Sequence, residues 1–114
     1  MDEKTLKEMI HYVYTGELTG VELNVQMVAW VADKYHLSGM MDLLCFRMKG
    51  DEVEDEYIAD MLIAAKRHDS DELKMIAMDK LRNKKEILSQ PAFRKKFKGD
   101  QNILFDLIQE FIIN

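Results

Sequence analysis

Residues 24–49 read NVQMVAWVADKYHLSGMMDLLCFRMK, and this stretch decides the fold. Between Val25 and Ala32 the only polar residue is Gln26, so a helix here would be apolar on nearly every side. A helix of that kind is buried, or it lies between two layers of a protein. Asn24 precedes it and is expected to cap its first turn by accepting a backbone N–H. We therefore predict a buried helix in the first half of this stretch.

A second helix is expected after a turn at residues 36–39. Ser38 is its expected N-cap. Its apolar side chains recur at the spacing of one helix face, and they are Met41, Leu44, Cys45 and Met48. Gly50 is expected to end the helix. The two helices would form a hairpin, and we expect the rest of the chain to cover it.

The remaining sequence also has the apolar periodicity of helices joined by short connections. One proline and five glycines occur in 114 residues, and good helix formers dominate. Further helices are expected at residues 3–15, 54–67, from Ser70 to Leu81, at 84–88, at 92–97 and after Asp100. Ser70 and Asp100 are expected N-caps, Pro91 is expected to begin the short helix, and Leu73 and Leu81 are expected to face inward. The prediction is an all-α fold of about seven helices in consecutive antiparallel pairs.

Length and composition indicate one globular domain of a reducing compartment. Hydrophobic residues make up 47% of the chain, which argues against disorder. No apolar run approaches the ~20 residues that span a bilayer, and the acidic N-terminus is unlike a signal peptide. A single cysteine excludes an internal disulfide. We expect no membrane association and a location in the nucleus or the cytoplasm.

Charge is distributed unevenly along the chain. Residues 1–57 hold five basic and twelve acidic side chains, whereas residues 58–114 hold eleven basic and nine acidic ones. The acidic extreme is residues 51–56, and the basic extreme is residues 80–98. Such polarity can orient partners or neighbouring copies. The alternative interpretation is two ordinary solvated surfaces.

The pattern of reactive side chains does not predict catalysis. The three histidines, at positions 11, 36 and 68, lack the spacing that a zinc site needs, and Cys45 has no nearby ligand partner. Cys45 lies among apolar residues and is expected to be a buried, inert thiol. A glycine-rich phosphate loop is also missing from the sequence. We therefore expect no metal, no cofactor and no enzymatic activity.

The segment from Phe93 to Lys98 interleaves aromatic and basic residues, as nucleic-acid-binding segments do. The two aromatic residues, Phe93 and Phe97, are four apart and would share the buried face of a short helix. The whole chain has a net charge of −5, whereas nucleic-acid-binding domains are usually basic. We expect the segment to pack inward and the chain to have no nucleic-acid partner.

Three motifs in order resemble one family. Val13-Tyr-Thr-Gly16, followed by Ala32-Asp-Lys-Tyr35, resembles the C-terminal half of a BTB (POZ) domain. Val53-Glu-Asp-Glu-Tyr-Ile-Ala-Asp-Met-Leu-Ile-Ala-Ala-Lys-Arg-His-Asp-Ser70 resembles the 3-box and the start of the BACK region, as in the MATH-BTB speckle-type POZ proteins. The resemblance implies a helical BTB part at residues 1–50 and a 3-box/BACK extension at 51–114.

The resemblance also implies a function in protein interaction. Members of the family are substrate adaptors of cullin-3 ubiquitin ligases, so the N-terminal region of cullin-3 is the expected partner. The residues that would contact it are Leu18, Val21, Asn24, Gln26, Tyr35, His36, Met61 and Leu62. The alternative is a homo-oligomer without cullin contact, held by the last helix through Leu107, Ile108 and Phe111.

The sequence departs from the family pattern in two places. The sheet and principal dimerisation helix of a BTB domain have no counterpart here, so the chain is expected to be either a fragment of such an adaptor or a divergent protein. Apolar surface is then expected on the first two helices, for a partner or a second copy to cover. The family's hydrophobic-x-acidic cullin tripeptide falls on Asn24-Val25-Gln26, whose outer residues do not fit. This second departure implies weaker cullin binding or its loss.

Overall fold

The computed structural model describes residues 3–16, 24–50 and 54–113, and every regular element in these ranges is a helix. The elements are α1 (Glu3–Thr15), α2 (Val25–Lys34), α3 (Ser38–Met48), α4 (Glu56–Arg67), α5 (Asp71–Arg82), the 3₁₀ turn η1 (Lys85–Ser89), α6 (Pro91–Lys95), α7 (Gln101–Ile108) and the π turn η2 (Gln109–Ile113). The predicted all-α fold with about seven helices is confirmed.

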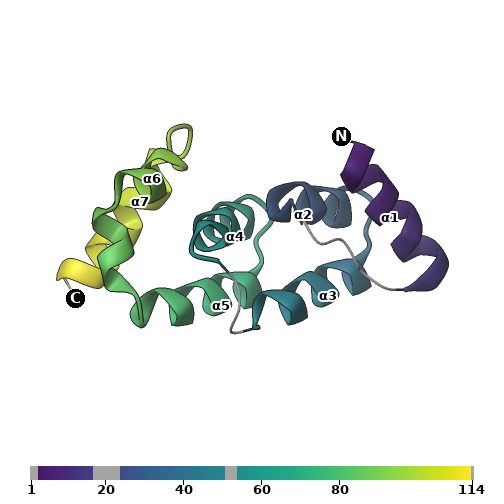
Figure 1. The fold of residues 1–114 in the computed structure, drawn as a ribbon, viewed down its shortest axis with the longest axis horizontal. Coiled ribbons are helices and arrows are strands. Elements are labelled where there is room, and N and C mark those ends of the chain that lie inside the picture. Colours follow the sequence, from purple (N-terminus) through teal and green to yellow (C-terminus); the bar gives the residue numbers. More distant parts are fainter. Residues whose placement is uncertain (1–2, 17–23, 51–53, 114) are drawn as a thin grey trace.

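The molecule is elongated, with extents of 46 × 27 × 23 Å. In Figure 1, α3 and α5 follow one another along the long axis, and α4 is seen nearly end-on beside them. Helix α1 forms one end of the molecule, and α6 and α7 form the opposite end. Surfaces on α1 and on α7 are therefore far apart.

Helix α4 is the centre of the packing. Seven of its side chains are buried, and they occupy nearly all sides of the helix. It packs against α5, α2 and α7. Our expectation that the hairpin of residues 24–49 is the centre was wrong. Three alanines of α4 are almost fully buried, namely Ala59, Ala64 and Ala65. Because their side chains are small, neighbouring helices can pack closely against α4.

A single buried cluster joins the two predicted parts of the chain. It runs from Val25 in α2 to Leu107 in α7. Cys45 in α3 is fully buried within it. Phe97 is also fully buried, with its ring centroid 5.2 Å from that of Phe93, so the predicted inward packing of this aromatic pair is confirmed.

The predicted side-chain caps are correct at α2 and α5 and wrong at α3 and α7. The side chain of Asn24 accepts the Met27 N–H at 3.0 Å, and that of Ser70 accepts the Leu73 N–H at 3.3 Å. Leu37, not Ser38, occupies the N-cap of α3, and no side chain caps this helix. The preceding His36 has a left-handed φ of 54°, which places Ser38 inside the first turn.

Helix boundaries differ from prediction mainly after residue 50. Helix α4 begins two residues later than expected, and the predicted helix at 84–88 is a 3₁₀ turn. Pro91 is the first residue of α6, as predicted. Asp100 has the expected position before α7 but makes no capping bond, because its carboxylate accepts from Arg67 instead.

Candidate protein-interaction surface

Helix α1 carries a row of exposed apolar side chains, which we call the α1 stripe. It consists of Leu6, Ile10 and Tyr14, which are four residues apart and 42%, 47% and 85% exposed. Residues at this spacing lie on one side of a helix. Helix α2 adds the partly exposed Trp30. The apolar surface expected on the first two helices is therefore present.

The end of α2 presents two exposed aromatic rings with a lysine between them. Trp30 is 38% exposed and Tyr35 is 49% exposed. The Lys34 ammonium nitrogen lies 4.6 Å from the Trp30 ring centroid and 5.8 Å from that of Tyr35, which are cation–π distances. His36 follows in the exposed turn. We call these four residues the aromatic end of α2.

A polar network connects α2 to the C-terminal helices through α4. The Gln26 amide donates to Asp60 Oδ1 at 2.8 Å, and its carbonyl oxygen accepts from Arg67 at 3.4 Å. Arg67 donates to both carboxylate oxygens of Asp100, at 3.0 and 3.2 Å. The second oxygen of Asp60 lies 3.3 Å from Lys96 Nζ. We call this set of five residues the Gln26 bridge.

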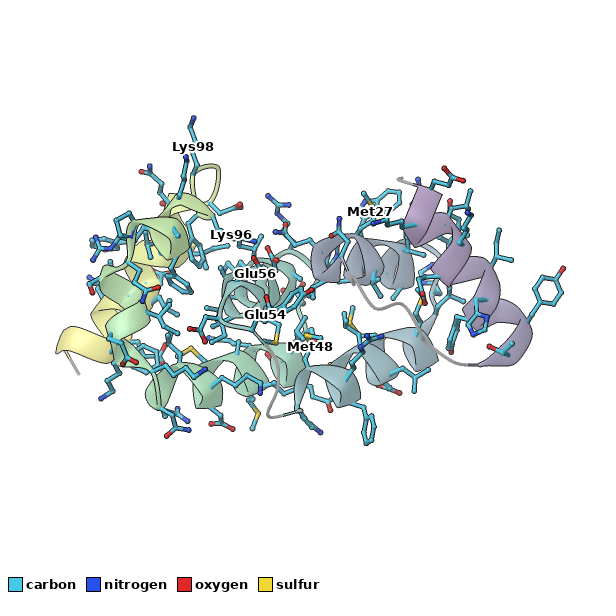
Figure 2. The ribbon with its side chains drawn as sticks, in the orientation of Figure 1. Met27, Met48, Glu54, Glu56, Lys96 and Lys98 are labelled. Atoms are coloured by element: carbon cyan, nitrogen blue, oxygen red, sulfur yellow. The ribbon has the colours of Figure 1, made fainter. Side chains whose placement is uncertain are left out.

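Sequence reasoning did not find the Gln26 bridge. Its pairs join residues that are 33 to 41 positions apart, so no helical spacing relates them. The amide–carboxylate bond between Gln26 and Asp60 is part-buried, and the side chain of Asp100 is only 18% exposed. The available signal was that Gln26 is the single polar residue between Val25 and Ala32. Figure 2 places Lys96 on the side of the C-terminal segment that faces α4.

A second polar contact joins α2 to the end of α4. His68 Nδ1 lies 3.0 Å from Asp33 Oδ2, and the His68 side chain is only 10% exposed. This contact fixes the end of α2, where Tyr35 and His36 project, relative to α4. Both ends of α2 are thus tied by polar side chains, Gln26 to α4 and Asp33 to His68 directly after it.

The structure separates the predicted cullin-contact residues. Tyr35 and His36 lie at the surface, whereas Asn24 caps α2. Met61 is fully buried and offers no surface. Leu62 is nearly buried and lines a cavity of about 220 Å³ between α4, α5 and α7. Gln26 is half-buried and bonds to α4 in the Gln26 bridge. Leu18 and Val21 lie outside the described residues.

The predicted self-association residues lie mostly inside the molecule. Leu107 is buried against the core, and Ile108 and Phe111 are half-buried. Phe105, which the predicted apolar stripe did not include, is 60% exposed on the other side of α7. A large aromatic residue off the main stripe of an amphipathic helix was the signal for it.

Cys45 is a poor candidate for a nucleophile. It is fully buried, as predicted. Burial raises the pKa of its thiol to about 11, and the carboxylates of Glu72 and Asp42 add to this effect. Reactive cysteines instead have a lowered pKa and partial exposure.

The described residues contain neither a candidate metal cluster nor a membrane-spanning helix. Within residues 3–16, 24–50 and 54–113, histidine, cysteine and acidic side chains form no group of three or more that could hold a metal ion. The helices described there are all too short or too polar to cross a membrane. No family model and no solved structure matches this chain.

Proposed function

We propose that this chain is a non-enzymatic protein-interaction module, an adaptor that docks the N-terminal region of cullin-3. The proposal rests on the resemblance of residues 13–16, 32–35 and 53–70 to BTB and 3-box segments. It is supported by an all-helical fold and by apolar side chains on α1 and α2 that stay exposed. Nuclear or cytoplasmic residence is part of the same proposal.

The observation that carries the proposal is the aromatic end of α2. Interface hot spots are enriched in Trp and Tyr, because these side chains bury a large area at a low cost in conformational entropy. Trp30 and Tyr35 are both exposed here, and the Asp33–His68 contact and the capped helix hold them in place. A rigid aromatic pair of this kind fits the surface of a protein partner.

Titration calorimetry of the whole chain with the cullin-3 N-terminal region tests this proposal. We expect a dissociation constant in the micromolar range or below, which corresponds to about −8 kcal/mol or better. Tyr35→Ala should weaken binding about tenfold or more, as hot-spot truncation does. The matched control is Phe105→Ala, which removes an exposed aromatic ring from the other end of the molecule and should leave affinity unchanged. An absence of binding by the wild-type chain at high micromolar concentration contradicts the proposal.

A second candidate function is self-association through the last helix, and the exposure of Phe105 favours it. Light scattering over a range of concentrations tests this alternative. Self-association predicts a mass above 13.4 kDa that falls to the monomer value in Ile108→Asp or Phe105→Asp. A wild-type chain that stays monomeric at all concentrations excludes it.

A further inference from the structure

The C-terminal helices are held to α4 by two ion pairs that meet at one side chain. Arg67 of α4 binds Asp100, the residue before α7, and Lys96, just after α6, binds Asp60 of α4. The Gln26 side chain bonds to Arg67 with its oxygen and to Asp60 with its nitrogen. A residue of α2 therefore supports both attachments of α6 and α7.

Packing beside these ion pairs is incomplete. A cavity of about 220 Å³ lies between α4, α5 and α7, with Leu62 and Leu107 in its lining. Another cavity of about 140 Å³ separates the first turn of α4 from η1 and α6, with Ile87 and Phe93 in its lining. The first of these is also lined by charged side chains, among them Lys66 and Asp106, and is open to solvent. Helix α7 packs against α4 less extensively than α5 does, so the ion pairs contribute relatively more to the attachment of α7 than to that of α5.

We propose that the Gln26 side chain couples partner docking on α2 to the release of the C-terminal helices. This inference rests on the proposed function and concerns its regulation. A partner group that accepts from the Gln26 nitrogen displaces Asp60, and one that donates to the Gln26 oxygen displaces Arg67. Either exchange weakens the hold of α4 on α6 and α7. Because coupling between two sites is reciprocal, release of α7 must strengthen docking by the same factor.

Amide hydrogen exchange of the free chain tests the intramolecular half of this inference. Gln26→Met keeps the length of the side chain and removes both hydrogen bonds, and Arg67→Gln removes the attachment of Asp100. Each variant should accelerate amide exchange in α7 about fivefold. This factor is at the low end of the range for coupled sites, because partly exposed ion pairs contribute little free energy. The matched controls are Gln90→Met and Arg82→Gln, whose side chains lie outside the Gln26 bridge.

Two results would overturn the coupling. One is unchanged α7 exchange in Gln26→Met, and the other is an equal acceleration in Gln90→Met. A measurement in salt uses the wild-type chain and so does not depend on the folding of any variant. Salt at about 1 M screens charges beyond ~3 Å and weakens the ion pairs. The added salt should therefore accelerate amide exchange in α7 more than in α5. Equal acceleration in both helices also contradicts the inference.

The partner half is tested with the cullin-3 N-terminal region. Arg67→Gln should bind it about fivefold more tightly than the wild-type chain, because Gln26 is then free of one internal bond. An unchanged or weaker affinity overturns this inference while leaving the proposed function intact. If the wild-type chain does not bind at all, the proposed function and the predicted effect on partner binding fail together. Amide exchange in α7 still decides whether the Gln26 bridge couples α2 to α7.

Discussion

Single polar side chains determine where several helices begin. Asn24 and Ser70 each accept a backbone N–H that would otherwise lack a partner in the first turn of a helix. Ser38 is the same kind of residue but lies one position too late to do so. Ser38 differs because the preceding His36 has a left-handed φ, so the turn between α2 and α3 ends at Leu37, one residue earlier than the sequence indicates.

This difference gives a prediction with an internal control. Asn24→Ala and Ser70→Ala should each lower the free energy of unfolding by about 1 kcal/mol, the usual cost of a lost N-cap. Ser38→Ala should change it by no more than about 0.5 kcal/mol, because Ser38 makes no capping bond. Urea unfolding of the three variants measures these values. A loss in Ser38→Ala as large as in Asn24→Ala would contradict the observed cap.

The buried thiol of Cys45 predicts a pH dependence of stability. Its pKa is raised from 9.0 to about 11, mainly by burial. The unfolded chain therefore ionises first, and the stabilisation from the neutral buried thiol is complete below pH 9 and is lost as the pH rises towards 11. Between pH 8 and pH 10.5 the loss should be on the order of 2 kcal/mol.

Comparison with Cys45→Ala isolates this contribution, since lysines and tyrosines also titrate in the same range. The wild-type chain should lose more stability than Cys45→Ala over this interval in denaturant unfolding. Parallel losses in the two proteins would show that the thiol has an ordinary pKa in the folded chain.

At the scale of helices, apolar periodicity predicted which elements exist but not which one is central. The stripes of α5 and α6 pack inward as predicted, including Leu73, Leu81 and Phe93. The apolar run from Val25 to Ala32 predicts that the hairpin is central, yet Trp30 within it remains exposed. The central role of α4 depends on its buried alanines. Alanine is common on both buried and exposed sides of helices, so its position in the sequence does not indicate that a helix is central.

Substitution of two methionines, one in α4 and one in α5, tests whether α4 is the central helix. Met61 of α4 is fully buried, whereas Met75 of α5 is 66% exposed. Met61→Ala should cost about 2–5 kcal/mol, because it removes buried contacts and leaves a cavity. Met75→Ala should stay within about 0.5 kcal/mol of the wild-type chain. Chemical denaturation compares the two, and similar costs would mean that α4 is not the central helix.

At the scale of the whole molecule, the two candidate surfaces lie on different parts of the fold. In Figure 1, α2 with its aromatic end lies on one side of α4, and α7, which carries the exposed Phe105, lies on the other. Adaptor docking and self-association would therefore use different surfaces. The sequence predicted exposed apolar surface near the N-terminus, but it could not show that Gln26 joins α2 to α4 and α7, since this follows from the packing of distant segments.

A hydrogen-exchange footprint of the complex with the cullin-3 N-terminal region tests the central claim most directly. We predict that saturating partner slows amide exchange in residues 24–38, which contain α2 and the turn with Tyr35 and His36, and does not slow it in α7. Slower exchange confined to residues 101–113, or no change anywhere in the chain, would contradict the account.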